Sequence, residues 1–189
     1  GAAPLEFSDH MGMPLKEGLR LVHNTLVGIG MREHVKLGAS GKIINSFDIA
    51  RALALGADWC NSARGFMFAL GCIQAQTCHT GNCPTGVATQ DPQRQIALVV
   101  PTKAERVKNF HQHTLVALQE MLQAAGLQSP QDIKAHHISH RLSNHETQSL
   151  AQLYPAISPG ALLKDNFSKL PEPFKSHWAK AQSQRFQSH

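Results

Sequence analysis

The order of short apolar runs between residues 35 and 70 limits the fold more than any other feature of the chain. Residues 35–37 are predicted to form a short strand leading into the loop GASG, and a helix is predicted over residues 46–55 with Ser46 as its cap. A second strand over residues 57–61 leads into the loop SARG and an apolar segment. Strand, loop and helix in repetition are typical of βα units in a parallel sheet. The sequence therefore predicts an α/β fold.

Further helices are predicted on both sides of these units. Apolar residues at intervals of three and four predict a helix over residues 14–29 with one buried face. In the second half, the motif TKAE at residues 102–105 predicts the start of a packing helix that ends near Gly126. The motifs SPQD at residues 129–132 and SNHE at residues 143–146 predict two more helix starts, the second before Leu150 and Leu153.

The two loops that follow the predicted strands have the residue types of a phosphate site. Small residues let the backbone approach a ligand, and an arginine can hold two phosphate oxygens. In a (β/α)8 barrel, the loops after the last two strands commonly bind a phosphate group through backbone N–H groups. Each loop alone is weak evidence, because most glycine-containing turns only connect elements. The candidate phosphate-binding residues are Ser40, Gly41, Lys42, Ala63, Arg64 and Gly65.

A stronger signal is the segment GCIQAQTCHTGNCPTGVATQDP, which contains Cys72, Cys78 and Cys83 in the spacing C-x5-C-x4-C. Compact thiolates suit an iron–sulfur cluster that lacks one iron, or a zinc site completed by His79. A third interpretation is that Cys72 is a small buried hydrophobic residue and that the other two are loop thiols. The remaining cysteine, Cys60, is expected in the core.

Composition and charge argue against several other classes of protein. The net charge of +5 comes from basic residues scattered along the chain, so no basic face for nucleic acid is predicted. The apolar runs are shorter than a membrane span of about 20 residues. Four cysteines without a secretory signal indicate a reducing, cytoplasmic compartment and metal or redox chemistry. The histidines at positions 136, 137, 140 and 145 are predicted to be exposed.

Several motifs resemble the FMN-binding synthase domain of glutamate synthases. They are GAAPLEFSDHMG, LRLVHNTLVGIGMREHVKLGASGKI, ALALGADWCNSARGFMFALGC and CHTGNCPTGVATQDP. The match runs from Gly1 to about Arg94 and more loosely to about Leu163. The resemblance implies the last βα units of a (β/α)8 TIM-type barrel, followed by a cysteine-rich cluster loop and a helical C-terminal extension. It also implies an oxidoreductase acting on CH–NH2 donors.

The resemblance further implies cofactors and partners. FMN would bind through its phosphate at Gly41, Lys42, Ala63 and Arg64, and Cys72, Cys78 and Cys83 would hold a 3Fe-4S cluster. Electrons would pass from ferredoxin or a reductase subunit, through the cluster and FMN, to 2-iminoglutarate, giving glutamate. Residues 1–4 would be the end of a loop that lies over the flavin.

Two departures from the family pattern shape the expectations. Asp9 stands where the family has a lysine that helps to bind a 2-oxo acid, and an anion there would repel a dicarboxylate. Most barrel strands of the family precede the part that this sequence matches, so we expect a fragment, a split-gene product or a truncated relative. A missing barrel half on another chain is one candidate partner. The alternative function is a non-catalytic metal-binding scaffold.

We expect three parts along the chain. Residues 1–100 would form the partial barrel with its iron–sulfur loop, and residues 101–163 the helical extension. Residues 164–189 would form a tail that docks weakly or stays mobile.

Overall fold

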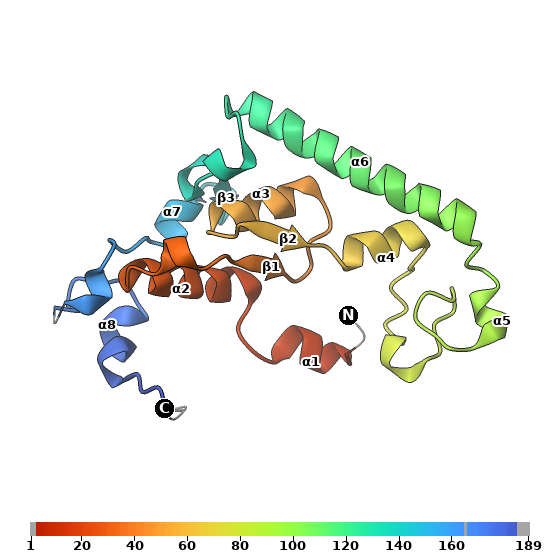
Figure 1. The fold of residues 1–189 in the computed structure, drawn as a ribbon, viewed down its shortest axis with the longest axis horizontal. Coiled ribbons are helices and arrows are strands. Elements are labelled where there is room, and N and C mark those ends of the chain that lie inside the picture. Colours follow the sequence, from red (N-terminus) through yellow and green to blue (C-terminus); the bar gives the residue numbers. More distant parts are fainter. Residues whose placement is uncertain (1–2, 165, 185–189) are drawn as a thin grey trace.

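A computed structural model describes residues 3–164 and 166–184, apart from the side chains of residues 5, 8 and 9. Its helices and strands follow one another as drawn in Figure 1. They are α1 (Leu5–His10), α2 (Leu15–Gly28), β1 (Gly38–Ser40), α3 (Ser46–Ala54), β2 (Trp59–Asn61), α4 (Arg64–Leu70), α5 (Pro92–Gln95), α6 (Val100–Ala124), β3 (Ser139–Arg141), β4 (Thr147–Ser149), α7 (Leu150–Leu153) and α8 (Phe174–His177). Short 3-10 turns are η1 (Arg32–His34), η2 (Cys78–Thr80), η3 (Pro130–Asp132), η4 (Ala135–His137), η5 (Ala161–Leu163) and η6 (Trp178–Lys180).

The predicted βα order is confirmed at the centre of the molecule. Strands β1 and β2 pair in parallel, with Gly38 opposite Trp59 and Ser40 opposite Asn61, and helix α3 connects them. The first strand lies later than predicted, because residues 35–37 lead into β1 as extended chain. Among the residues that the structure describes, the parallel sheet has two strands and no barrel is closed. The molecule is thus a small α/β piece.

Arg32 and Asp58 tie together the segments that precede the two strands. The Asp58 carboxylate accepts hydrogen bonds from Arg32 at 2.9 Å and from the Leu37 backbone N–H at 2.7 Å. The Arg32 guanidinium also donates to the carbonyls of Val35 and Gly56, and to Nδ1 of His23. Because these bonds lie immediately before β1 and β2, they set the register of the parallel pair and hold its start against α2.

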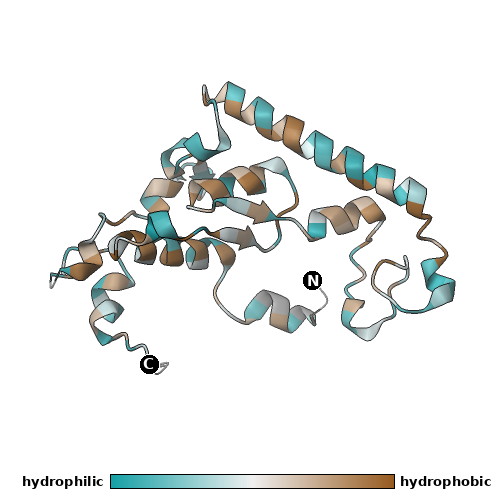
Figure 2. Cartoon of the chain, viewed as in Figure 1, coloured by the Kyte–Doolittle hydropathy of each residue, from teal (hydrophilic) through white to brown (hydrophobic). Residues whose placement is uncertain are grey.

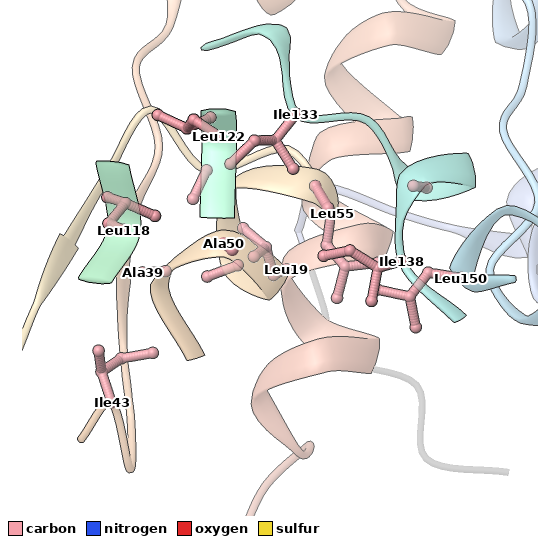
Figure 3. Packing of buried hydrophobic residues seen from close by; sticks show 14 residues of the cluster. Leu19, Ala39, Ile43, Ala50, Leu55, Leu118, Leu122, Ile133, Ile138 and Leu150 are labelled. Atoms are coloured by element: carbon pink, nitrogen blue, oxygen red, sulfur yellow. The ribbon is translucent and has the colours of Figure 1, made fainter. Parts of the chain in front are cut away.

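One apolar cluster joins the βα unit to the second half of the chain (Figure 3). Leu55 of the βα unit and Leu150 of α7 are 1% and 2% exposed. Leu118 and Leu122 come from α6, along which apolar and polar residues alternate (Figure 2). Ile133 and Ile138 complete the contact from the segments beside η4. Residues on both sides of position 100 therefore share one core.

A second, smaller cluster holds the segments after α7 against α2. Asn24 donates to the Pro155 carbonyl, and Gly28 allows Leu162 to approach so closely that an added Cβ would lie 2.5 Å from the leucine side chain. Phe174, at 4% exposure, and Trp178 pack there too. Within the predicted tail, Phe174 and Trp178 are therefore docked, whereas residues 179–184 are exposed.

Three further local predictions were wrong. Asn45, not Ser46, caps α3, because its side chain accepts from the Asp48 N–H while Asp48 accepts from the Asn45 N–H. The helix predicted at residues 102–105 begins earlier, with α6 at Val100. No helix starts at residues 143–146, because this segment is the turn between β3 and β4, and Ser149 caps α7 instead.

None of the helices within residues 3–164 and 166–184 combines the length and the hydropathy that a membrane-spanning helix requires.

We expect Arg32→Met to lower the free energy of unfolding by about 2–4 kcal/mol, because it leaves the partly buried Asp58 with fewer charged donors. Urea unfolding followed by circular dichroism measures this change. The Arg141 side chain is exposed and has no hydrogen bond or ion pair among the described residues. Arg141→Met is therefore the matched control and should stay within about 0.5 kcal/mol of the parent. Equal losses in both variants would contradict the role given to Arg32.

His23 should make stability depend on pH. Burial, and then the charges of Arg20 and Arg32, lower the pKa of His23 to about 4 from its ordinary value of 6.5. The unfolded chain therefore binds the proton first, and stability that is complete above about pH 6.5 is lost as the pH falls toward 4. The expected loss is about 1–2 kcal/mol, reduced because the ring is only partly buried. His23→Gln should remove this component in urea titrations at successive pH values, and an unchanged pH slope would refute it.

Candidate functional site

The two predicted phosphate loops and two of the cysteines line a single cavity. The cavity has a volume of about 160 Å³ and lies where β1 and β2 end, beside helix α4. Because parallel strands end at the same edge of a sheet, both loops reach this edge together. Its lining comprises Ala3, Ser40, Gly41, Lys42, Ala63, Arg64, Met67, Phe68, Cys72, Gln74, Gln76 and Cys78.

The first loop has a backbone that turns sharply toward the cavity. Gly41 has φ +144°, a conformation that side chains rarely adopt, and Lys42 follows with φ +52°. In the second loop, the Arg64 guanidinium has no hydrogen bond or ion pair with the rest of the described chain and is half-buried at the cavity. The pair of loops therefore brings two cationic side chains, Lys42 and Arg64, to one small space.

Gly65 lies beside the cavity in a different role. It is buried, and an added Cβ would come within 2.9 Å of the Ile44 carbonyl oxygen and of the Phe110 ring. The absence of a side chain thus lets α4 pack against α6, where Phe66 and Phe110 meet edge to face with centroids 5.5 Å apart. Gly65 fixes the helix that carries Arg64 and Met67.

The three clustered cysteines line a second, smaller pocket that adjoins the first. Cys72, Cys78 and Cys83 face it together, and Met67, Cys72, Gln76 and Cys78 belong to both pockets. Cys72 follows α4 directly and its sulfur accepts from the Gln74 N–H at 3.4 Å. The segment between the first two cysteines is tightly folded, because Gln74 and Gln76 have φ +58° and +59°. Positive φ values at non-glycine residues are typical of functional loops.

Cys83 has surroundings that favour a thiolate. Burial alone would raise its pKa, but hydrogen bonds from the Thr85 hydroxyl and from the backbone N–H groups of Ala88, Thr85 and Val87 outweigh it and lower the pKa to about 7. The Thr85 oxygen lies 3.5 Å from the sulfur. Such a cradle of donors stabilises negative charge on sulfur. By contrast, burial raises the pKa of Cys60 to about 11, and Cys60 packs on the main core as predicted.

Arg94 and Gly86 hold the Cys83 loop in place. Arg94 of α5 donates to the Asn82 carbonyl at 3.1 Å and forms an ion pair with Asp91. Gly86 has φ +77° and passes so close to α5 that an added Cβ would lie 2.3 Å from the Arg94 carbonyl oxygen. Only glycine fits at this crossing. The helix α5 is therefore the support for one side of the cysteine pocket.

The residues fit the cofactors that the family resemblance implies. A cavity of about 160 Å³ is smaller than the range of about 300–1,000 Å³ for whole-ligand pockets, but its cations and turning backbone suit the phosphate end of FMN. Three cysteines around one pocket, one of them with N–H donors at its sulfur, suit an iron–sulfur cluster, in which thiolates bind separate irons. Among the described residues, no three His, Cys, Asp or Glu side chains stand close enough together to hold a metal ion in this conformation, whether zinc or iron.

Sequence reasoning missed several residues of the site. Met67 and Phe68 lie three and four positions after Arg64, so the helical period could have placed them on the same side. The strained backbone at Gln74 and Gln76 had no signal in the sequence. Two further expectations are outside the described residues: Gly1 and Ala2 are not described, nor is the side chain of Asp9, although Ala3 lines the cavity.

The histidines of the second half are exposed, as predicted. The rings of His136 and His137 lie with centroids 4.0 Å apart and are tilted by 58° to each other. His140 is in β3, and His145 is in the turn between β3 and β4. In the part of the chain that the structure covers, they belong to no group that could hold a metal ion.

Comparison with known proteins confirms the family. Residues 1–128 match the family model described as a conserved region in glutamate synthase. The glutamate synthase large subunit-like protein YerD of Bacillus subtilis is 44% identical over 141 residues, covering 75% of this chain and 27% of that protein. The archaeal glutamate synthase [NADPH] of Methanocaldococcus jannaschii is 37% identical, covering 71% and 26%. The ferredoxin-dependent glutamate synthase 1 of Arabidopsis thaliana is 34% identical, covering 70% and 8%.

The chain thus spans about a quarter or less of the length of these relatives. The part matched by the family model includes both loops, α4, all three clustered cysteines and the whole of α6. The chain belongs to the glutamate synthase family.

Proposed function

We propose that this chain forms the part of a glutamate synthase-type oxidoreductase in which a 3Fe-4S cluster meets the phosphate end of FMN. The observation that carries the proposal is that the phosphate-loop cavity and the cysteine pocket share Met67, Cys72, Gln76 and Cys78. Two sites that share walls keep their ligands next to each other. When bound, the cluster and FMN would supply the electron transfer that reduces 2-iminoglutarate to glutamate, with electrons from ferredoxin or a reductase subunit.

The chain's own residues would bind and orient these groups. Arg64 would hold two phosphate oxygens with its guanidinium, and the turn at Gly41 and Lys42 would bring backbone N–H groups to the same phosphate. Cys72, Cys78 and Cys83 would each bind one iron. The N–H donors at the Cys83 sulfur would stabilise negative charge there, which is one of the ways proteins set the potential of a cluster.

The parallel sheet supports a barrel completed by other strands. Gly38, Ser40, Trp59 and Asn61 share one face of the pair, and all are exposed, whereas Ala39 on the other face is buried. The Trp59 ring lies over Gly38, where an added Cβ would be 2.6 Å from it. In a closed barrel this face would be the interior. We therefore propose that strands beyond residues 1–189, on this or another chain, pair with β1 and β2.

Iron analysis tests the cluster. Anaerobically purified protein should contain about three irons per chain together with acid-labile sulfide, and Cys78→Ala should lose most of both. Cys60→Ala is the matched control, because Cys60 is the cysteine outside the cluster loop and should leave the iron content unchanged. Iron that survives Cys78→Ala, or zinc in place of iron, would contradict the cluster and favour a metal-binding scaffold.

Flavin binding tests the phosphate loops. FMN should bind about tenfold or more tightly than riboflavin, which lacks the phosphate, because charge-assisted hydrogen bonds contribute about 1.5–3 kcal/mol. Arg64→Met should remove most of that preference, and Arg141→Met should not. Quenching of flavin fluorescence gives both affinities. If FMN is not bound in preference to riboflavin, the phosphate assignment fails.

A further inference from the structure

A second cavity lies at the opposite end of the same two strands. Its volume is about 460 Å³, and it opens among α2, η1, the end of α3, the turns η3 and η4, and α7, on the side of Figure 1 away from α4. Arg32 and Asp58, which precede β1 and β2 in the chain, are among its lining residues. The phosphate loops follow the strands, so this cavity is separate from the proposed cofactor site.

The lining of this cavity is strongly cationic. Arg20, Arg32 and Lys134 line it, and Asp58 is the one acidic residue among the lining side chains. The Asp58 charge is already matched by Arg32 at 2.9 Å and by Lys36 at 3.7 Å. His23, whose Nδ1 accepts a hydrogen bond from Arg32, also lines the cavity and brings no negative charge to balance the arginines. The remaining positive charge of Arg20 and Lys134 is therefore unbalanced.

Arg20 is the unusual member of this lining. It is only 9% exposed, yet its single hydrogen bond within the described residues runs from Nε to the Tyr154 carbonyl at 3.1 Å. No fully buried side-chain nitrogen or oxygen in the described structure lacks a partner, so the two terminal guanidinium nitrogens must be reached by solvent. The cavity is where Arg20 meets solvent. The two terminal nitrogens are thus donors without a protein partner in the part of the chain that the structure describes, and a guanidinium fork of this kind can bind two oxygens of an anion in place of water.

We propose that this cavity is a binding site for the oxyanion group, phosphate or carboxylate, of a small ligand. The Arg20 fork would hold two oxygens of the anion, and Lys134 at the rim would add a point charge. Lys134 Nζ now donates to the Gln131 carbonyl on an exposed turn, from which it can reach across the opening. The turn of η3 and η4 comes from the second half of the chain, so the site joins the two halves around one ligand.

Inorganic phosphate is the first probe, added to the full chain in the millimolar range at constant ionic strength made up with sodium chloride. We expect saturable NMR shifts of the Arg20 side-chain Nε–H and of the His23 ring. Lys134→Gln should weaken binding about three- to fivefold, and Arg20→Lys, which keeps the charge but loses the fork, about tenfold. Lys108→Gln, at an exposed lysine of α6 away from the cavity, is the control and should leave the affinity unchanged.

A parallel titration with succinate separates the two kinds of oxyanion. The site is supported if either anion binds saturably at Arg20 and His23, and if Arg20→Lys weakens binding more than Lys134→Gln does. The anion that binds more tightly shows whether the site prefers phosphate or carboxylate. Non-saturating shifts with both anions, or equal weakening by Lys108→Gln, would overturn the proposal. Circular dichroism checks that each variant is folded before its affinity is compared with that of the parent.

Discussion

The bond between Arg32 and Asp58 is the constraint on which the rest of the molecule depends. It joins the segments that lead into β1 and β2. The same Asp58 carboxylate accepts a hydrogen bond from the Leu37 N–H, so the two strands start in register. Since parallel strands that start together also end together, the loops at Ser40–Lys42 and Ala63–Arg64 meet at one edge. The network of Arg32 and Asp58 thus lies between the cationic cavity at the strand starts and the candidate cofactor site at the strand ends.

Helices packed beside the candidate site hold its loops and cysteines in position. Gly65 lets α4 press against α6, and α4 carries Arg64 at its start and Cys72 just after its end. On the other side, Arg94 and the crossing at Gly86 hold Cys83 where N–H donors surround its sulfur. Helices therefore position the phosphate loops and the cysteines, and small residues at a few crossings allow the required approach.

The sequence was sufficient to predict which residues come together at the candidate site and insufficient to predict the boundaries of several elements. The βα order, the loop residues and the three cysteines could be predicted because small residues, helix caps and thiol spacing have local physical causes. The hairpin at residues 139–149 was missed because SNHE fits a helix start and a turn equally well, and pairing with a distant strand decided the outcome. The support by Arg94 and the cavity around Arg20 were also beyond prediction, since both depend on contacts between segments far apart in the sequence.

The central claim is that the phosphate cavity and the cysteine pocket hold neighbouring cofactors. The most direct test is the phosphorus NMR relaxation of bound FMN, compared between the iron-loaded protein and the same protein after removal of iron. The account predicts markedly faster relaxation and a broader phosphorus signal in the iron-loaded protein, because unpaired electrons on the cluster would lie close to the phosphate. Equal relaxation in the two samples, with FMN bound in both, would contradict the shared wall of Met67, Cys72, Gln76 and Cys78 as the meeting point of cluster and flavin.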